Sequence, residues 1–445
     1  MFGRRGWWAG SSVALVLASA SPAWATQPLQ DFLQRAEVQN FDVRESNATE
    51  RQRGSEADAV LGRLTPAVSA RGVYTRNQTE VSAQLPGATE ELVITPLDQA
   101  EAIFLLDVPI VDLANYHRYK AAKAIAKSSS EQRDATFIDV SRSVARAYYT
   151  FIGASALVIS AQRSIAAAQD NLNLVSERRS AGAATELDYE RAASAVARAQ
   201  QDLADAELGV ALAGRALSTL SGLEPQPALE YPPEDDLHAE GPLQNWLTRA
   251  ADTPAVRVAQ QQHEAVQQNR KAANRALLPT LTGSANERIS NATGFSGRAS
   301  SYQLQLILGW RLDYSLVATT NAQDAALDAQ TVRLERSRRA AEDATFEAYA
   351  RVNNGISNSR SSRVEAQSAT RAAELASTRY DAGVATQLDV TEAQRDAFLA
   401  TAARIQSDAE LAYARVALRL AVGERISGSG ATTTTKAPTA PETNR

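Results

Sequence analysis

The sequence contains no cysteine, one methionine and few aromatic residues. Without cysteine the chain forms no disulfide, offers no thiol for catalysis and has no N-terminal cysteine for lipid attachment. Its histidines, His117, His238 and His263, lie in unrelated segments, and no phosphate-binding loop, nucleophile elbow or zinc-protease motif is present. We therefore expect no catalytic residues, no metal site and no cofactor, and a protein that is not an enzyme.

An excess of charge of one sign is also missing. The formal net charge is −5 at pH 7, and acidic and basic residues are spread along the chain, so nucleic acid is not an expected partner. After the first 25 residues, no run is apolar enough for long enough to cross a bilayer as a helix. Any passage through a membrane would then be made by β-strands.

The first residues have the pattern of a secretory signal peptide. Arg4 and Arg5 form a basic region, residues 9–20 form a short apolar core, and Ala23-Trp24-Ala25 places small residues at both positions that a signal peptidase recognises. A retained anchor would need an apolar run of about 20 residues. We predict that residues 1–25 are cleaved and that the mature chain is exported.

Two segments of the chain repeat each other at a fixed spacing. Residues 180–188 read SAGAATELD and residues 381–389 read DAGVATQLD, an offset of 201 residues that Arg178 and Arg379 also keep. The repetition predicts two structural repeats and a linker between them. The predicted boundaries are 26–222 for the first repeat, 223–252 for a Pro-rich connector, 253–426 for the second repeat and 427–445 for a disordered low-complexity tail.

Long heptad patterns flank both repeated segments. Small or apolar residues recur at steps of three and four over 157–175, 196–220 and 398–416. This pattern predicts two antiparallel helical hairpins, each with a glycine in its turn. A helix from about Leu113 to Ser180 would be about 100 Å long, which no compact domain can contain. A free-standing coiled coil would explain these seams but not the strands described next.

Other segments show the alternation of β-strands with one apolar face. The residues expected to face lipid are Tyr302, Leu304, Leu306, Leu308 and Trp310 in the second repeat and Phe104, Leu106 and Val108 in the first. Weaker strands are predicted near 68–75 and 280–289, with polar loops at 78–99 and 291–300. Four strands cannot close a membrane barrel, so several copies must share one, and three copies would supply 12 strands. The alternative is a half-buried sheet in a soluble protein.

Together these features resemble the TolC family of outer-membrane efflux proteins, over residues 27–427 and in both halves. The most specific pieces are the two A-G-x-x-T-x-L-D turns and the segment LDVPIVD at 106–112. The resemblance implies a mainly α protomer with a small β part and two repeats. Its homotrimer would join a 12-stranded transmembrane β-barrel to a long coiled-coil α-barrel in the periplasm, encircled by a girdle of short helices and chain ends. The implied location is the outer membrane of a Gram-negative bacterium, without lipidation.

The function implied by the resemblance is that of a passive exit duct for a tripartite efflux pump or a type I secretion system. Its partners would be a periplasmic adaptor and an inner-membrane pump of the RND, ABC or MFS type, besides outer-membrane lipid. The adaptor would dock onto the two turns, at Gly182, Thr185 and Leu187 and at Gly383, Thr386 and Leu388. The competing hypothesis is a periplasmic coiled-coil scaffold or adaptor protein without a pore.

A gated periplasmic entrance is also implied by the resemblance. Asp188 resembles a carboxylate that meets a tyrosine of the second hairpin, Tyr380 resembles that tyrosine, and a locking arginine of the family falls at Ala385. Asp389 and Glu392 resemble an acidic constriction, and residues so spaced on a helix face the same way, so that threefold repetition makes a ring of like charge. Asp188 and Asp389 are equally suited to capping the helices that follow their turns, and the sequence leaves both roles open.

Overall fold

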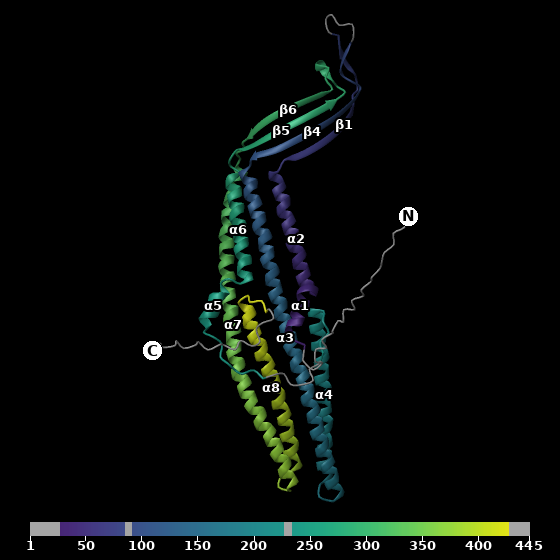
Figure 1. Ribbon diagram of the computed structural model, residues 1–445, viewed down its shortest axis with the longest axis vertical. Coiled ribbons are helices and arrows are strands. Elements are labelled where there is room, and N and C mark those ends of the chain that lie inside the picture. The colour runs from purple at the N-terminus through teal and green to yellow at the C-terminus, as the bar shows by residue number, and fades with distance from the viewer. Residues whose placement is uncertain (1–26, 85–90, 227–233, 427–445) are drawn as a thin grey trace, which may run out of the picture.

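The structure is a computed structural model that describes residues 27–84, 91–226 and 234–426. A β-sheet stands at one end of a set of long helices, and two helical hairpins extend from it to the other end (Figure 1). The predicted signal peptide at 1–25 and the predicted tail at 427–445 lie outside the described residues.

The two halves of the chain place their elements in nearly the same order. The first half contains α1 (Leu29–Gln39), α2 (Phe41–Leu61), η1 (Gly62–Leu64), β1 (Ala67–Arg76), β2 (Val81–Ala83), β3 (Leu92–Thr95), β4 (Asp98–Val111), α3 (Leu113–Ser180) and α4 (Glu186–Ser221). The second half contains α5 (Leu243–Ala250), α6 (Pro254–Arg275), β5 (Thr280–Ser290), η2 (Gly294–Ser296), β6 (Ser300–Gly309), α7 (Tyr314–Asp381) and α8 (Gln387–Ala421). Each half thus leads through strands into one long helical hairpin.

The long helices α3 and α7 begin and end at positions related by the repeat. Both have 68 residues, and α3 has the limits expected from the sequence, Leu113–Ser180. Asp112 caps α3 by accepting a hydrogen bond of 2.8 Å from the backbone N–H of Asn115. Asp313 caps α7 in the same way, at 3.0 Å from the N–H of Leu316. Because these two aspartates are also 201 residues apart, the repeat extends from the hairpin turns to the sheet.

The sheet joins the two repeats in its middle. Its strand order is β1-β4-β5-β6, all antiparallel, so that β4 of the first repeat pairs with β5 of the second and β1 and β6 form the edges. The register places Leu106 beside Ala285, and Ala285 beside Leu304. Since alternate residues of a strand share a face, the predicted apolar residues of β4 and β6 lie on the same face of the sheet. Leu304 and Leu308 on that face are 74% and 70% exposed in the single chain.

Several local details differ from the expectations. Trp310 follows the end of β6, and its indole N–H donates to the carbonyl of Leu277 at 3.0 Å, so it lies at the base of the sheet rather than in a strand. The predicted loop at 78–99 contains the small β2–β3 hairpin. The connector contains the helix α5, which begins directly after Pro242. Proline is tolerated at the start of a helix, because the first N–H groups of a helix have no partner within it. Pro109 lies at a break in register, as its missing N–H requires.

Among the described residues, α3 is long and apolar enough to cross a membrane by length and composition alone. The expectation that no such segment follows the first 25 residues is therefore wrong. The apolar residues of α3 serve packing, because this helix contacts α1, α2, α4, α6 and α8. Val144 and Ala145, for example, have no exposed surface.

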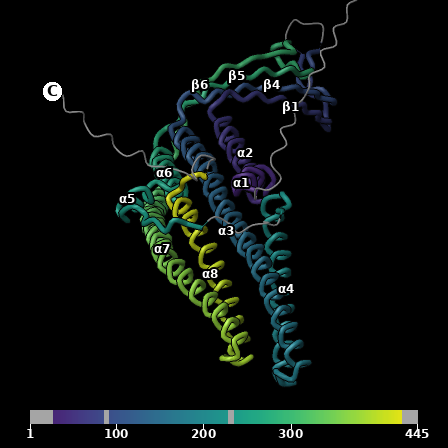
Figure 2. The backbone as a smooth tube through the Cα atoms, turned by 60° about the horizontal axis from the view of Figure 1, so that its bottom comes forward, coloured from purple at the N-terminus to yellow at the C-terminus, as the bar shows by residue number. Residues whose placement is uncertain are grey.

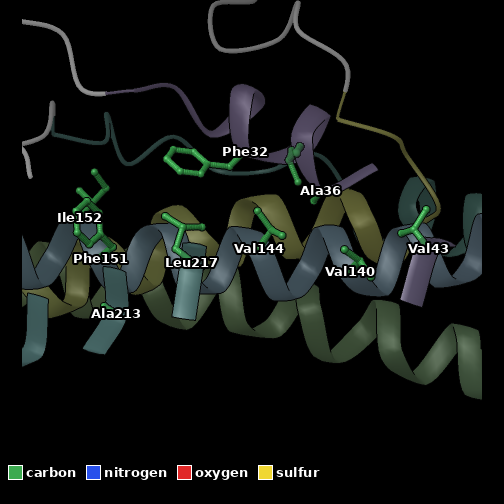
Figure 3. Close-up of a cluster of buried hydrophobic side chains, with 10 residues drawn as sticks. Phe32, Ala36, Val43, Val140, Val144, Phe151, Ile152, Ala213 and Leu217 are labelled. Carbon is green, nitrogen blue, oxygen red and sulfur yellow. The ribbon is translucent and has the colours of Figure 1, made fainter. Parts of the chain in front are cut away.

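The largest apolar cluster lies halfway along the helices. Figure 3 shows Phe32 and Ala36 of α1 above Val144 of α3 and Leu217 of α4, with Val43 of α2 to the right of Val144. Full burial of a large apolar side chain contributes about 1.5–3 kcal/mol, so this cluster fixes α1 against the first hairpin. A second cluster, which includes Val352, Leu411 and Leu418, holds α7 to α8. Both clusters are distant from the hairpin ends, which depend on contacts of their own.

Candidate functional site: the two hairpin ends

The two hairpins end in turns of the same geometry. Gly182 and Gly383 have φ angles of 75° and 77°, a left-handed conformation that favours glycine at the end of a helix. The next residue in each turn, Ala183 or Val384, donates its N–H to a carbonyl of the preceding helix, at 2.7 Å and 2.9 Å. The two hairpin ends lie beside each other, at the end of the molecule away from the sheet (Figure 2).

Asp188 and Asp389 complete reciprocal caps at the start of α4 and α8. The carboxylate of Asp188 accepts from the N–H and hydroxyl of Thr185 at 3.1 Å and 2.7 Å, and that of Asp389 accepts from the N–H and hydroxyl of Thr386, both at 2.8 Å. Hydrogen bonds from Thr185 hold the pKa of Asp188 below its ordinary value, and the backbone and hydroxyl of Thr386 do the same for the pKa of Asp389. Capping is therefore one role of both aspartates in the single chain.

Tyr380 lies at the contact between the two hairpins. Its side chain is 8% exposed and packs in a cluster with Val175 and Ala192 of the first hairpin and Val390 of the second. The guanidinium carbon of Arg178, on α3, lies 4.4 Å from the centre of its ring. Asp188, the residue that we expected to meet this tyrosine, is engaged within its own turn.

Arg178 binds the end of α7 across this contact. Its Nη1 donates to the carbonyl oxygen of Tyr380 at 2.8 Å, and its Nη2 donates to the carbonyl oxygen of Asp381 at 3.1 Å and to a carboxylate oxygen of Asp381 at 3.4 Å. These carbonyls are the last of the helix, where positive charge is favoured by the helix dipole. We call this set of contacts the Arg178 clamp.

Sequence reasoning did not find the Arg178 clamp. It identified Tyr380 and noticed that Arg178 corresponds to Arg379, but it looked for the partner of Tyr380 among the carboxylates. The available signal was the sequence Arg178-Arg179 before the first turn, where the second repeat has Arg379-Tyr380. A cation therefore faces an aromatic ring across the two repeats, although the arginine that the family resemblance implied is Ala385 here.

The remaining predicted residues of the hairpin ends are exposed. Leu187 and Leu388 are 58% and 41% exposed at the first turn of α4 and α8. Glu392 is exposed one helical turn after Asp389. Farther from the turns, a groove of about 320 Å³ lies between the hairpins and is lined by residues of α3, α4, α7 and α8, among them Arg198, Arg395 and Phe398.

The connector is held against the second hairpin by ion pairs. Arg415 of α8, with 9% of its side chain exposed, binds Asp235 at 2.7 Å and Glu240 at 2.8 Å. Asp235, Asp236 and His238 are also close enough together to hold a metal ion by distance alone. Since Arg415 and His238 already engage the two carboxylates, we interpret this group as the attachment of the connector.

Comparison with known proteins places these features in one family. Residues 32–223 and 249–424 match the profile of the outer membrane efflux protein family. The outer membrane protein OprJ of Pseudomonas aeruginosa is 27% identical over 66% of this chain, and the match spans 64% of OprJ, slightly less than two thirds. TtgC of Pseudomonas putida, a probable efflux pump outer membrane protein, is 25% identical over 87% of this chain and 82% of its own.

A solved structure shows the same fold. The CmeC outer membrane channel of Campylobacter jejuni aligns with a TM-score of 0.74 at 15% identity and covers 89% of this chain and 85% of that chain. At that identity the likeness concerns the fold alone, whereas the family profile matches most of the sequence, through both repeats and both hairpin ends. The chain belongs to the outer membrane efflux protein family.

Proposed function

We propose that three copies of this chain form a passive exit duct through the outer membrane. The observation that supports this most directly is the sheet, which has four strands, one apolar exposed face and two edges, β1 and β6, that pair with no other strand in the described part of the chain. Unpaired backbone groups cost several kcal/mol each in lipid. Copies that pair β6 of one chain with β1 of the next remove both edges and make a barrel of 12 strands, three times four.

The long helices would continue the barrel as a tunnel into the periplasm. Such a tunnel supports a part in a tripartite efflux pump or a type I secretion system, with energy supplied by an inner-membrane pump of the RND, ABC or MFS type. We assign the repeats to 26–222 and 253–426, with cleavage of residues 1–25 on export and no lipid attachment.

The hairpin ends are the proposed docking place of a periplasmic adaptor. Exposed apolar side chains such as Leu187 and Leu388 at both turns are the kind of surface that a protein partner covers. The turns themselves are fixed by Gly182, Gly383 and the threonine caps. The groove between the hairpins offers a second surface beside the turns.

The same ends would form the gate. The Arg178 clamp holds the two hairpins of one chain together, and Asp389 with Glu392 would form an acidic ring when three copies meet. A ring of carboxylates binds multivalent cations and repels anions. Opening would then require separation of Arg178 from the end of α7.

Recording from the purified protein in planar lipid tests this function. We expect a trimer that conducts and is blocked by trivalent cations, and we expect Asp389→Asn with Glu392→Gln to weaken that block at unchanged trimer content. Asp202→Asn with Asp205→Asn is the matched control, because these residues have the same spacing on α4 away from the turn. An unchanged block in the first variant removes the gate assignment. A monomeric protein that stays soluble without detergent and never conducts favours the scaffold hypothesis and ends the duct proposal.

A further inference from the structure

Lysine is rare in this chain and concentrated in one place. Of its five lysines, Lys120, Lys123 and Lys127 lie within eight residues of each other at the start of α3, Lys271 lies near the end of α6, and Lys436 lies outside the described residues. Arginine supplies most of the other basic residues of the chain. The three lysines of α3 are all exposed, and we call them the lysine stripe.

The lysine stripe occupies one face of α3. Its residues continue the three–four spacing of Leu113 and Tyr116, and the same spacing leads farther down the helix to Phe137 and Tyr148. Phe137 and Tyr148 pack in the cluster that includes α1, with the rings of Tyr148 and Phe32 5.7 Å apart. At 100° per residue, Phe137 and Tyr148 lie about 70° and 50° around the helix from the mean direction of the three lysines, so the lysine stripe shares the half of α3 on which α1 packs.

The flanks of α3 are covered by its neighbours in the helical layer. His117 contacts Gln268 of α6 at 2.8 Å, and Arg133 binds Glu50 of α2 at 2.8 Å. The lysine stripe lies on neither flank. In the proposed tunnel, the face that carries α1 is the outer one, because three copies of α1 on the inner face would occupy the lumen.

The height of the lysine stripe places it directly below the sheet. At 1.5 Å per residue, Lys120, Lys123 and Lys127 lie about 10, 15 and 21 Å along α3 from Leu113, the first residue after the strand-to-helix junction. Side chains on a helix lean toward its N-terminus, which for α3 is the end that meets the sheet. Lys120 shows this direction, since its Nζ lies 4.7 Å from the ring centre of Tyr116, one turn closer to the sheet.

Carboxylates do not neutralise the lysine stripe within the described residues. No ion pair joins any of its three ammonium groups to an acidic side chain there. The next acidic residue along α3, Glu131, is bound by Arg257 of α6 at 2.6 Å. Three cations thus project from the outer face, immediately beyond the strands whose apolar face would meet the hydrocarbon.

We propose that the lysine stripe binds the phosphate groups of anionic lipids in the periplasmic leaflet of the outer membrane. This inference rests on the proposed function, because the apolar sheet fixes the position of the bilayer. Long lysine side chains reach toward a headgroup layer while their stems lie along the protein. Basic residues near an anionic surface favour binding by roughly fivefold each, and the attraction falls off within a Debye length of about 8 Å. Lys120 therefore contributes most and Lys127 least.

Lipid preference of the reconstituted trimer tests this proposal. The trimer is placed in nanodiscs of phosphatidylcholine alone or with about one third phosphatidylglycerol, and the phospholipids that it retains are counted by native mass spectrometry. We expect the wild-type protein to retain phosphatidylglycerol at least fivefold over its share of the mixture. The variant Lys120→Gln with Lys123→Gln and Lys127→Gln should lose that preference, and Lys120→Gln alone should lose more of it than Lys127→Gln alone.

Arg118→Gln is the matched control. Arg118 lies near the height of Lys120 but about 170° around the helix from the mean direction of Lys120 and Lys123, on the opposite exposed face. It should leave the lipid preference unchanged. Inorganic phosphate added to the phosphatidylcholine discs should not be retained by the trimer in place of the anionic lipid. Equal retention by the wild type and the triple variant overturns the proposal.

The failure of this inference is distinct from failure of the duct. A protein that does not float with phosphatidylcholine vesicles contradicts the membrane-spanning sheet itself. A protein that inserts and conducts in phosphatidylcholine but shows no preference for phosphatidylglycerol contradicts only the role of the lysine stripe.

Discussion

The two hairpin ends share their turn chemistry and differ in the layer directly behind it. Each turn has a left-handed glycine and a Thr–Asp cap. Behind the first turn, Arg179 stacks on Tyr189 and binds Glu186 at 2.9 Å within its own hairpin. Behind the second turn, the equivalent positions hold Tyr380, Val390 and Gln387, all buried.

This difference gives the two hairpins different roles. In the first hairpin, Arg179 is engaged by Glu186 and Tyr189 of the same hairpin, and Arg178 reaches across to the second. The second hairpin presents a buried aromatic ring and the carbonyls at the end of α7, which receive that arginine. Duplication of a hairpin thus explains the turns, and divergence at a few positions behind them produced a contact between unlike partners.

Loss of the Arg178 clamp should break this contact and produce the largest change that we predict, an increase in channel opening. Arg178→Gln loses hydrogen bonds from a charged donor, each worth about 1.5–3 kcal/mol, so the ratio of open to closed entrances should rise at least about tenfold. The measurement is single-channel conductance in planar lipid. Arg379→Gln is the control at the equivalent position of the other repeat, and a similar rise in that variant would show that the effect is not specific to the clamp.

The shared turn geometry predicts that replacing the turn glycine destabilises both hairpin ends equally, and by less than loss of the Arg178 clamp. Gly182→Ala and Gly383→Ala should each destabilise their hairpin end by about 1 kcal/mol, because a side chain disfavours positive φ. An added Cβ at either position would meet no atom within 4 Å, so the cost is conformational and not steric. Amide hydrogen exchange of the terminal turns measures it. A clearly larger effect in one hairpin would contradict equivalence of the turns.

The pH dependence of the two caps should be the smallest effect and the same at both ends. The pKa values of Asp188 and Asp389 are lowered by their hydrogen bonds with Thr185 and Thr386. A lowered pKa stabilises the fold above the ordinary aspartate value of about 3.9, and this stabilisation is lost as the pH falls from there through the lowered value. The difference in thermal stability between wild type and Asp188→Ala should therefore stay constant from pH 7 to about 5 and shrink below pH 4.

The same difference in thermal stability from wild type is measured as a function of pH for Asp389→Ala. It should follow the same curve as Asp188→Ala. A difference that instead changed near neutral pH would assign the dependence to groups other than these caps.

Much of the fold could be predicted from the sequence because its signals are local and periodic. The junction at Asp112 and the turn at Gly182 indicated the limits of α3, the fixed offset of 201 residues paired the two turns, and alternation located β4 and β6. The small β2–β3 hairpin and α5 were missed, since they are short and lie in segments rich in polar residues and proline. The apolar content of α3 was underestimated because it is distributed among several helix contacts and forms no continuous run.

The candidate site was predictable only in part. Asp188 and Asp389 were found because they belong to a repeated motif, and Tyr380 was found through the family resemblance, by its place nine residues before Asp389. Arg178 was not assigned a contact, since its acceptors are backbone carbonyls, which carry no signature in the sequence. Sequence patterns cannot reveal a bond between one side chain and a main chain that lies 202 residues away.

The use of main-chain acceptors by Arg178 determines which mutations can loosen the contact between the two hairpin ends. Carbonyl oxygens persist whatever residue occupies positions 380 and 381, so substitutions there leave both shorter bonds of the clamp available. Substitution of Arg178 itself removes both bonds, because only the forked guanidinium of arginine reaches both oxygens. In the proposed gate, selection for leaky variants should therefore recover changes at residue 178 far more often than at residue 381, whereas Tyr380 also contributes its buried ring to the contact.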